Sequence, residues 1–264
     1  MKKTTRLIWL GLSTASLPTL ATDKLSLSSE VEYSSGKYGG TEATDILFVP
    51  FVAKFESGPA ILKLTVPYVE INGPGNVLIV NAGPVPIGTL TAPLMTASTQ
   101  RSRASGLGDI MASVSYNAFY DALSGLLVDI GSKIKFATAS KAQGLGTGKN
   151  DFGLQADVYQ SLGRATTLMA TLGYTWMGKP EGSNFRNIIS TSVGMAYKLD
   201  TDTTLSAFLD VRQSVISTHP TPRELTLYIS RSLGKNWKIQ TYALTGMSEA
   251  SPRKGIGATL GYSL

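Results

Sequence analysis

The chain has 264 residues with a formal net charge of +6, 27 glycines, one histidine and no cysteine. Without cysteine the protein can form neither a disulfide nor a thiolate metal site, and it has no cysteine nucleophile. No linker or change in composition divides the sequence, so we expect one domain. The positive charge does not indicate a nucleic-acid partner, because three of the basic residues lie in an N-terminal segment that we expect to be removed.

The first residues have the features of a secretory signal peptide. Three basic residues precede an apolar stretch at 7–17, and the small residues up to Ala21 suit cleavage by signal peptidase. The apolar stretch is shorter than the roughly 20 residues that a membrane-spanning helix needs. We therefore predict a signal peptide at 1–21 and a mature domain at 22–264, whose net charge falls to +3.

The rest of the sequence repeatedly alternates between apolar and polar residues, which is the pattern of strands whose two faces meet different surroundings. For example, Leu126, Val128 and Ile130 alternate with Asp129 and Gly131. No stretch after the signal peptide is long and apolar enough for a transmembrane helix. The predicted strands lie at about 25–33, 45–55, 60–71, 110–118, 126–136, 152–158, 167–176, 189–197, 205–211, 225–233, 237–243 and 255–264.

Connections between the predicted strands are alternately short and long, as in outer-membrane β-barrels with tight periplasmic turns and longer external loops. Five short and six long connections imply twelve strands with both ends in the periplasm. We therefore predict an all-β fold, a transmembrane antiparallel β-barrel of bacterial outer-membrane type in contact with outer-membrane lipid. In the alternative, a soluble barrel or sandwich, the apolar faces would point to a core. The short connections lie at 56–59, 121–125, 162–164, 200–202 and 234–236, and the long ones at 35–44, 72–107, 138–150, 178–186, 214–223 and 246–253.

The alternation assigns residues to the two faces of the barrel. Aromatic residues should gather where the outer apolar band meets water. The external set is Tyr33, Tyr68, Phe136, Phe152, Tyr174 and Trp176, and the periplasmic set is Phe55, Tyr120, Tyr197, Trp237 and Tyr262. Charged residues of both signs share the polar face, which favours a pore wall or a salt-bridged lumen over a metal or acid/base site. The predicted lumen-lining residues are Glu30, Glu32, Lys63, Asp129, Lys133, Lys135, Asp157, Asp210, Arg212, Glu224 and Lys238.

The predicted loop at 72–107 is unusual because it contains apolar runs, among them 77–80 and much of 84–95. Exposed apolar runs of this kind are normally covered. We hypothesise that the loop folds into the barrel mouth as a constriction or an apolar binding patch, so that deleting residues 76–95 would raise the conductance.

Two features could indicate other chemistry. Outer-membrane lipases, acyltransferases and proteases use a histidine base, and His219 could act in this way with Ser214 or Ser217 as the nucleophile. An exposed histidine beside a proline is more often incidental. The run at 144–149 resembles a phosphate-binding loop, but it has one residue too few before Gly-Lys and Asn150 follows in place of Ser or Thr. We expect no nucleotide, metal or other cofactor.

Short glycine-rich motifs carry a resemblance to a known family. They are 105–110 (Ser-Gly-Leu-Gly-Asp-Ile), 133–138 (Lys-Ile-Lys-Phe-Ala-Thr) and 144–148 (Gly-Leu-Gly-Thr-Gly). With these motifs the chain resembles the outer-membrane transporter family named for the MetA-pathway of phenol degradation, from about residue 30 onward. The resemblance implies a monomeric or weakly associated barrel that transports small hydrophobic or aromatic compounds. Its motif residues are Gly106, Gly108, Asp109, Gly144, Gly146 and Gly148.

The last ten residues alternate between apolar residues, such as Ile256 and Leu260, and mostly glycine. This pattern resembles the terminal signal that the barrel-assembly machinery recognises, with Leu264 where an aromatic residue is usual. We expect that machinery to be a partner during insertion.

The function expected from the sequence is a passive outer-membrane channel for small, hydrophobic or aromatic organic solutes, without catalysis. Two alternatives remain open. One is an outer-membrane barrel hydrolase or acyltransferase that uses His219. The other is a closed structural or surface-recognition barrel whose lumen is filled by salt bridges.

Overall fold

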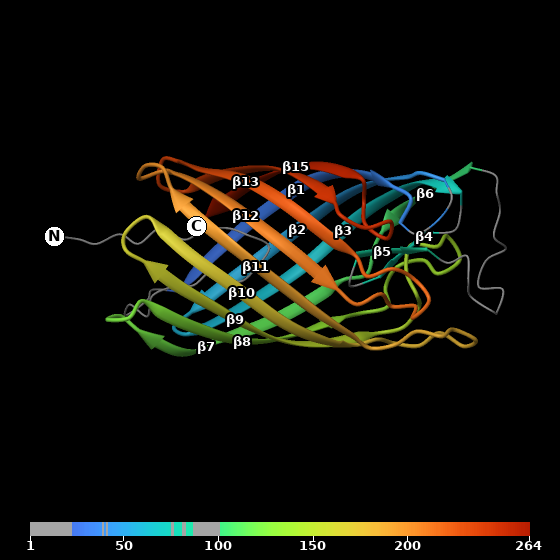
Figure 1. The fold of residues 1–264 in the computed structure, drawn as a ribbon, viewed down its shortest axis with the longest axis horizontal. Coiled ribbons are helices and arrows are strands. Elements are labelled where there is room, and N and C mark those ends of the chain that lie inside the picture. The colour runs from blue at the N-terminus through green and yellow to red at the C-terminus, as the bar shows by residue number, and fades with distance from the viewer. Residues whose placement is uncertain (1–22, 39, 41, 75–76, 81–82, 87–100) are drawn as a thin grey trace.

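The computed structural model describes residues 23–38, 40, 42–74, 77–80, 83–86 and 101–264, which form strands and their connections (Figure 1). The predicted signal peptide at 1–21 lies outside these residues. No helix within them is long and apolar enough to span a membrane. The strands are β1 (Lys24–Gly36), β2 (Thr44–Ser57), β3 (Ala60–Pro74), β4 (Val77–Val80), β5 (Gly83–Pro86), β6 (Arg101–Leu107), β7 (Met111–Asp121), β8 (Leu126–Lys135), β9 (Asp151–Leu162), β10 (Thr166–Trp176), β11 (Ile188–Lys198), β12 (Thr203–Arg212), β13 (Arg223–Leu233), β14 (Trp237–Gly246) and β15 (Lys254–Ser263).

The main sheet closes on itself as a twelve-stranded antiparallel barrel, as the sequence predicts. β1 pairs on one side with β2 and on the other with β15, from Ser26 opposite Ser263 to Ser35 opposite Lys254. β3 pairs with β7 in its first half and with β6 in its second half, so β6 and β7 together occupy one position in the barrel. Closure gives β1 and β15 a partner strand on each side, and a strand in hydrocarbon requires such partners for its backbone groups.

Short and long connections gather at opposite ends of the barrel (Figure 1). We call these the short-turn end and the long-loop end. The start of β1 and the end of the described residues lie at the short-turn end, where the backbone N–H of Leu264 donates to the carbonyl oxygen of Leu25 at 2.9 Å. This arrangement confirms the alternation of connections that the sequence predicts.

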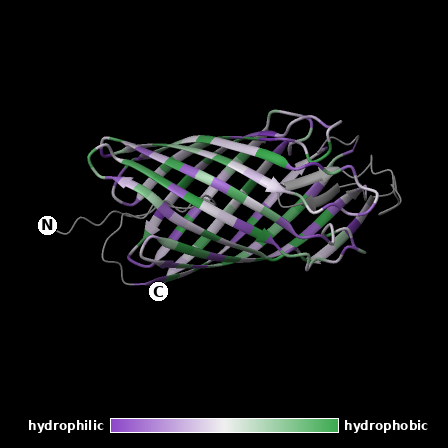
Figure 2. Ribbon diagram, turned by 90° about the horizontal axis from the view of Figure 1, so that it is seen from below, coloured by the Kyte–Doolittle hydropathy of each residue, from purple (hydrophilic) through white to green (hydrophobic). Residues whose placement is uncertain are grey.

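Apolar and polar residues alternate along the strands (Figure 2), and many large apolar side chains are exposed on the outside of the barrel. Leu172 is 58% exposed and Ile256 is 64% exposed, whereas Asp157 and Ser192 on the opposite face of the sheet are buried. Each strand therefore turns its apolar side outward, the reverse of a soluble barrel. A surface of this composition suits hydrocarbon and does not suit water.

Aromatic side chains pack together near both ends of the apolar band. At the long-loop end the ring of Trp176 lies 4.6 Å from that of Tyr174 and 5.5 Å from that of Phe152, measured between centroids. At the short-turn end the rings of Trp237 and Tyr262 are 4.8 Å apart. These residues lie where the sequence places its two aromatic belts.

Tyr120 is an exception, and its assignment to the periplasmic belt is wrong. The pairing of β7 with β8 shifts between Asn117 and Phe119, so one extra residue enters the strand. Such a bulge reverses the inside-outside alternation beyond it. Phe119 is therefore exposed on the outside, whereas Tyr120 packs against buried apolar residues on the inside.

The connection predicted at 72–107 is partly strand. Residues 101–107 form β6, and β4 and β5 pair as a separate two-stranded hairpin. In the view of Figure 1 this hairpin lies within the outline of the barrel at its long-loop end. Residues 75–76, 81–82 and 87–100, to which the constriction hypothesis also refers, lie outside the described residues.

Candidate functional site: the barrel interior

The charged residues predicted to line the lumen all lie on the inner face of the sheet, where they alternate with outward apolar side chains. Several are engaged with neighbours. Asp129 accepts a hydrogen bond from the Asn117 amide at 2.9 Å. Asp157 accepts one from the Thr171 hydroxyl at 2.6 Å and one from the Gln155 amide at 2.7 Å. Their inward placement leaves open whether solutes pass them, which is part of the function proposed below.

An acidic wall faces the interior on β1 and on β12 to β15. The Tyr242 hydroxyl donates to Glu30 at 2.6 Å and also contacts the Glu32 carboxyl group. The Thr259 hydroxyl donates to the second oxygen of Glu30 at 2.7 Å. Asp210 and Glu224 oppose each other across β12 and β13, and Arg212 lies 3.5 Å from Glu224.

Aromatic and apolar side chains also face the interior, a position that the sequence did not predict for them. We call Leu127, Tyr159, Met169, Ala196 and Phe208, with Tyr120 and Tyr228 packed against them, the aromatic cluster. The rings of Phe208 and Tyr228 are 5.9 Å apart edge to face, and the ring of Tyr228 lies 5.0 Å from that of Tyr242. The cluster therefore continues into the acidic wall. The alternation of the two faces along β12 could have predicted the inward position of Phe208, because it lies between the inward residues Ser206 and Asp210.

Close approach of the Phe208 ring depends on a glycine on the neighbouring strand. Gly194 lies opposite Phe208, and a Cβ atom on Gly194 would be 2.4 Å from the ring. A larger residue there would push the ring away from the wall into the lumen. The glycine thus determines how far the aromatic cluster projects.

The inner face of β2 and β3 is apolar as well. Along β2, Phe48, Pro50 and Val52 point inward, and Pro67 and Val69 do so on β3. This explains why the sequence of β2 is apolar on both faces. One wall of the interior therefore offers an apolar surface beside charged neighbours.

The long-loop end of this wall is covered by a cluster of buried side chains. We call Tyr38, Ile46, Val69, Ile71, Ala139 and Leu145 the outer cluster. Leu145 comes from the β8–β9 loop and reaches the inner faces of β2 and β3 across the barrel mouth. Tyr38 has a φ of 48°, a conformation that costs a non-glycine residue roughly 1–2 kcal/mol, which the packing must offset. Burial also raises the pKa of Tyr38, whose hydroxyl donates to Ser34 at 3.0 Å.

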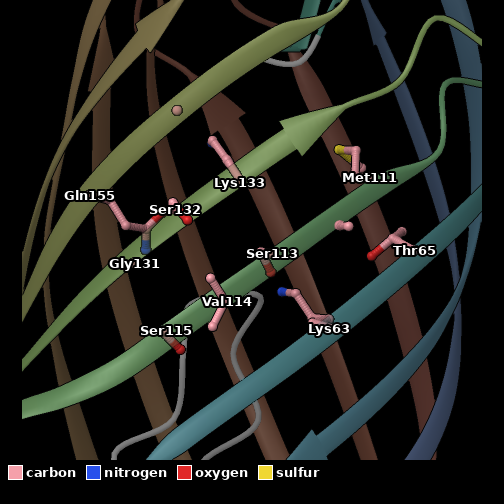
Figure 3. A pocket seen from close by; sticks show the side chains of 12 residues that line it. Lys63, Thr65, Met111, Ser113, Val114, Ser115, Gly131, Ser132, Lys133 and Gln155 are labelled. Carbon is pink, nitrogen blue, oxygen red and sulfur yellow. The ribbon is translucent and has the colours of Figure 1, made fainter.

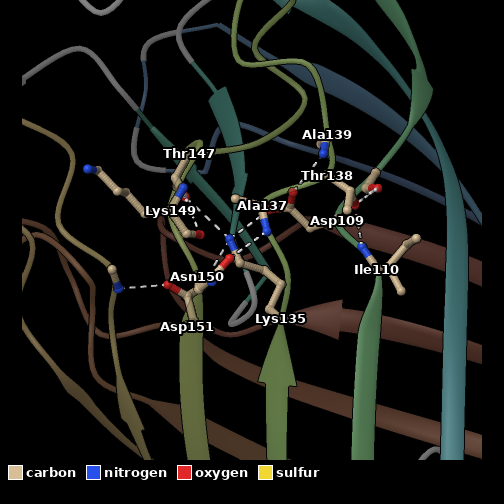
Figure 4. Close-up of polar contacts among 12 residues, drawn as sticks. Asp109, Ile110, Lys135, Ala137, Thr138, Ala139, Thr147, Lys149, Asn150 and Asp151 are labelled. Carbon is tan, nitrogen blue, oxygen red and sulfur yellow. Dashed lines mark hydrogen bonds and ion pairs between the residues drawn. The ribbon is translucent and has the colours of Figure 1, made fainter.

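A buried ion network, which we call the latch, holds the β8–β9 loop at the mouth (Figure 4). It consists of Asp109, Lys135 and Asp151. The Lys135 ammonium group donates to Asp109 at 2.7 Å and lies 3.1 Å from Asp151, and all three side chains are at most 7% exposed. The remaining donor of Lys135 reaches the Thr147 hydroxyl at 3.3 Å.

Backbone amides complete the latch. The N–H of Ala139 donates to Asp109 at 2.9 Å, and the N–H of Gly178 donates to Asp151 at 2.8 Å. These bonds stabilise the second negative charge, since the network has two carboxylates and one ammonium group. They also tie the β8–β9 and β10–β11 loops to the barrel wall.

The glycine motifs that carry the family resemblance meet at the latch. Gly146 lies against Asp109, and a Cβ there would be 3.0 Å from both carboxylate oxygens. Gly144 and Gly148 have φ values of 71° and 67°. Gly108 joins β6 to β7 and donates its N–H to the carbonyl oxygen of Pro67 at 2.8 Å, and Gly106 precedes it in β6. The sequence placed Lys135 on the pore wall, whereas the structure shows it closed into this network.

A recess of about 240 Å³ indents the inner wall between β3 and β9 (Figure 3). Lys63 and Lys133 lie on either side of Ser113, to which each is the direct cross-strand neighbour. Small residues such as Ser115 and Gly153 leave the space. Its inward lining residues are Lys63, Thr65, Met111, Ser113, Ser115, Gly131, Lys133, Gly153 and Gln155.

A second cavity, of about 670 Å³, opens at the short-turn end. Inward residues of the last strands, including Ser230 and Lys238, line it together with the turn at 200–202. The inner wall is therefore accessible from this end.

The histidine considered as a catalytic base lies in the β12–β13 loop. Within the described residues, the polar contact of the His219 ring is with the Thr218 hydroxyl at 3.5 Å, and the ring reaches neither Ser214 nor Ser217. An activated nucleophile needs its base at about 2.6–3.2 Å. Partial burial lowers the pKa of His219. The structure therefore does not assemble the predicted base and nucleophile.

Two solved structures share this architecture at low sequence identity. An outer membrane channel from Pseudomonas putida F1 gives a TM-score of 0.70 at 10% identity, and the match covers 94% of this chain and 97% of that one. The KdgM porin, in complex with disordered oligogalacturonate, gives a TM-score of 0.52 at 9% identity, covering 91% and 99%. These similarities establish the fold. No family model and no curated protein matches the sequence, so membership of the MetA-pathway family stays a prediction.

Proposed function

We propose that the protein is a passive channel of the bacterial outer membrane for small hydrophobic or aromatic organic compounds, as the resemblance to the MetA-pathway transporter family implies. Outer-membrane lipid would surround its apolar band, and the barrel-assembly machinery would insert it. The observation that carries the proposal is the aromatic cluster on the inner wall of a barrel whose outer surface is apolar. An aromatic ring that enters the barrel would find aromatic and apolar partners on this wall, whereas a uniformly charged wall would favour ions.

The residues around the aromatic cluster favour transient contact with an aromatic solute over tight binding of that solute. Tyr228 and Tyr242 place hydroxyl groups beside the acidic wall, so a ring that leaves the cluster meets polar groups. Passage through a channel requires that each contact be weak enough to release the solute. No energy source is needed when the solute moves down its gradient.

The test combines conductance with solute flux for the purified mature chain. Reconstituted in planar bilayers, it should give discrete current steps, and proteoliposomes should admit benzyl alcohol. Phe208→Ala should lower the ratio of benzyl alcohol flux to glycerol flux about two- to tenfold, because one aromatic contact contributes about 0.5–1.5 kcal/mol. Leu172→Ala, on the outer surface, is the matched control and should leave the ratio unchanged.

The alternatives give different results in the same experiment. A closed structural barrel would fold and shift on electrophoresis after heating, yet show neither current nor flux. The channel proposal would be contradicted if the wild-type protein gave neither bilayer current nor solute flux and a strain lacking the protein took up aromatic compounds at the normal rate.

A further inference from the structure

The outward faces of β13, β14, β15 and β1, which pair in that order, are apolar and end in positive charge at the long-loop end. Ile256 on β15 is 64% exposed and Tyr33 on β1 is 43% exposed. Arg223 and Lys254 begin β13 and β15 on the same outward side. Within these four strands no Asp or Glu points outward, because their glutamates belong to the inner acidic wall.

A hollow of about 740 Å³ opens beside Lys254, between the β1–β2 and β14–β15 loops. Three exposed basic residues, Lys37, Arg253 and Lys254, line it. Glu249 is the one acidic residue among the described residues of the lining, so three positive charges against one negative leave a formal charge of +2. Within the described part of the chain, none of the three basic side chains forms a hydrogen bond or an ion pair.

The loop that carries Arg253 is fixed to the strands on both sides. The Ser251 hydroxyl accepts from the N–H of Arg223 at 2.8 Å and donates to its carbonyl oxygen at 2.9 Å. The N–H of Met247 donates to the same carbonyl oxygen at 2.8 Å. Gly36 on β1 packs against the loop so closely that a Cβ atom there would lie 2.7 Å from the Arg253 nitrogen. The hollow is therefore formed before any ligand binds, which reduces the entropy lost on binding.

The chemistry of this face suits an amphiphile with a phosphate group. Ammonium and guanidinium groups bind phosphate oxygens, and a guanidinium group can do so with two parallel N–H bonds. Lys254 and Ile256 lie two residues apart on the same side of β15, so an apolar surface begins directly beside the cations. A free phosphate ion would use the hollow alone, whereas a lipid would also bury its acyl chains against the strands.

From this juxtaposition we propose that the hollow binds the phosphate group of an anionic lipid of the surrounding membrane. Lys37, Arg253 and Lys254 contact the phosphate, and the outward apolar face of β15 and β1 contacts the acyl chains. The inference rests on the membrane placement in the proposed function and adds a lipid partner to it.

The test measures lipid binding separately from transport. In native mass spectrometry of the full mature chain released from detergent, dioctanoyl phosphatidic acid should bind more tightly than dioctanoyl phosphatidylcholine, which has the same acyl chains and no net charge. Arg253→Gln and Lys254→Gln should each weaken binding of phosphatidic acid about fivefold, the effect of one basic residue near an anionic headgroup, and leave phosphatidylcholine unaffected. Lys254→Arg should retain most of the affinity.

Lys179→Gln is the matched control, because it removes the same charge from the exposed β10–β11 loop at the same end of the barrel, separated from β15 by β12, β13 and β14. It should change the affinity for neither lipid. Without added lipid, thermal unfolding of every variant in detergent should match that of the wild type, so that weaker binding does not reflect a damaged fold.

Equal affinity for the two lipids, or phosphatidic acid binding that survives Arg253→Gln and Lys254→Gln combined, would overturn the inference. Inorganic phosphate that binds as tightly as phosphatidic acid would overturn the lipid assignment in favour of a free anion. Bilayer current and benzyl alcohol flux are measured on the same preparations. If these persist while phosphatidic acid binding fails, the channel stands and the lipid site falls. Phosphatidic acid binding without current or flux would support the lipid site and remove the channel.

Discussion

Lys133 and Lys135 lie two residues apart on the same face of β8, yet their surroundings differ completely. Lys135 lies opposite Asp151 on β9 and is closed between two carboxylates, whereas Lys133 lies opposite Gly153. One lysine therefore fixes the loops at the barrel mouth, and the other turns toward the recess. The difference shows that the cross-strand neighbour, more than the residue type, decides whether a lysine on this face is closed between carboxylates.

The largest effect is expected when the latch loses its cation. Lys135→Ala should destabilise the barrel by about 3–5 kcal/mol, because Asp109 and Asp151 would remain buried without a counter-charge. The β8–β9 loop should then become sensitive to external protease. Thermal unfolding followed by the heat-dependent shift on electrophoresis measures the loss. Lys254→Ala, at an exposed strand end, is the control and should change the stability by less than about 0.5 kcal/mol.

Replacing all three latch residues tests whether the loss of stability in Lys135→Ala comes from the unpaired buried charges or from a change in the conformation of the loop. Asp109→Asn, Lys135→Met and Asp151→Asn together should cost less than Lys135→Ala alone, since no unpaired charge remains. A triple variant that is less stable than Lys135→Ala would contradict this account of the latch.

An intermediate effect is expected at the outer cluster. Leu145→Ala should cost about 2–3 kcal/mol through the cavity that it leaves against the inner faces of β2 and β3. Because Leu145 reaches across the mouth, single-channel current should also become noisier than in the wild type. Leu123→Ala, in the exposed β7–β8 turn, should alter neither property.

The smallest effect is expected at His219, where the structure assembles no nucleophile. His219→Ala should leave conductance, thermal stability and esterase background at wild-type values. A loss of hydrolytic activity in this variant would instead favour the enzyme alternative.

Much of the barrel could be predicted from local pattern, because each strand turns one face to an apolar and one to a polar environment. The strand segments, the alternation of connections and the inward position of residues such as Asp129 all follow from this period of two. Tyr120 was misassigned because a bulge interrupts the period, and nothing in the local sequence marks the bulge. β6 was not predicted, because the residues that precede it at 72–100 lack a regular period of two and give the whole of 72–107 the pattern of one long loop.

The interior was harder to predict, because its contacts join strands distant in sequence. Asp109, Lys135 and Gly146 were each noted, but their convergence depends on register across β7, β8 and β9. The recess has the same origin, since Lys63 and Lys133 become neighbours of Ser113 only when β3, β7 and β8 are aligned. Alternation gives the face on which a residue lies, and register decides what it meets there.

The pairing of β1 with β15 has a consequence for biogenesis. Because β1 takes its second partner from β15, the barrel cannot close until β15 is in place. A partial barrel would expose two rows of unsatisfied amides and carbonyls, which hydrocarbon does not tolerate. In the proposed outer-membrane setting, a chain that lacks β15 would therefore lack the closing seam and would stay open to proteolysis.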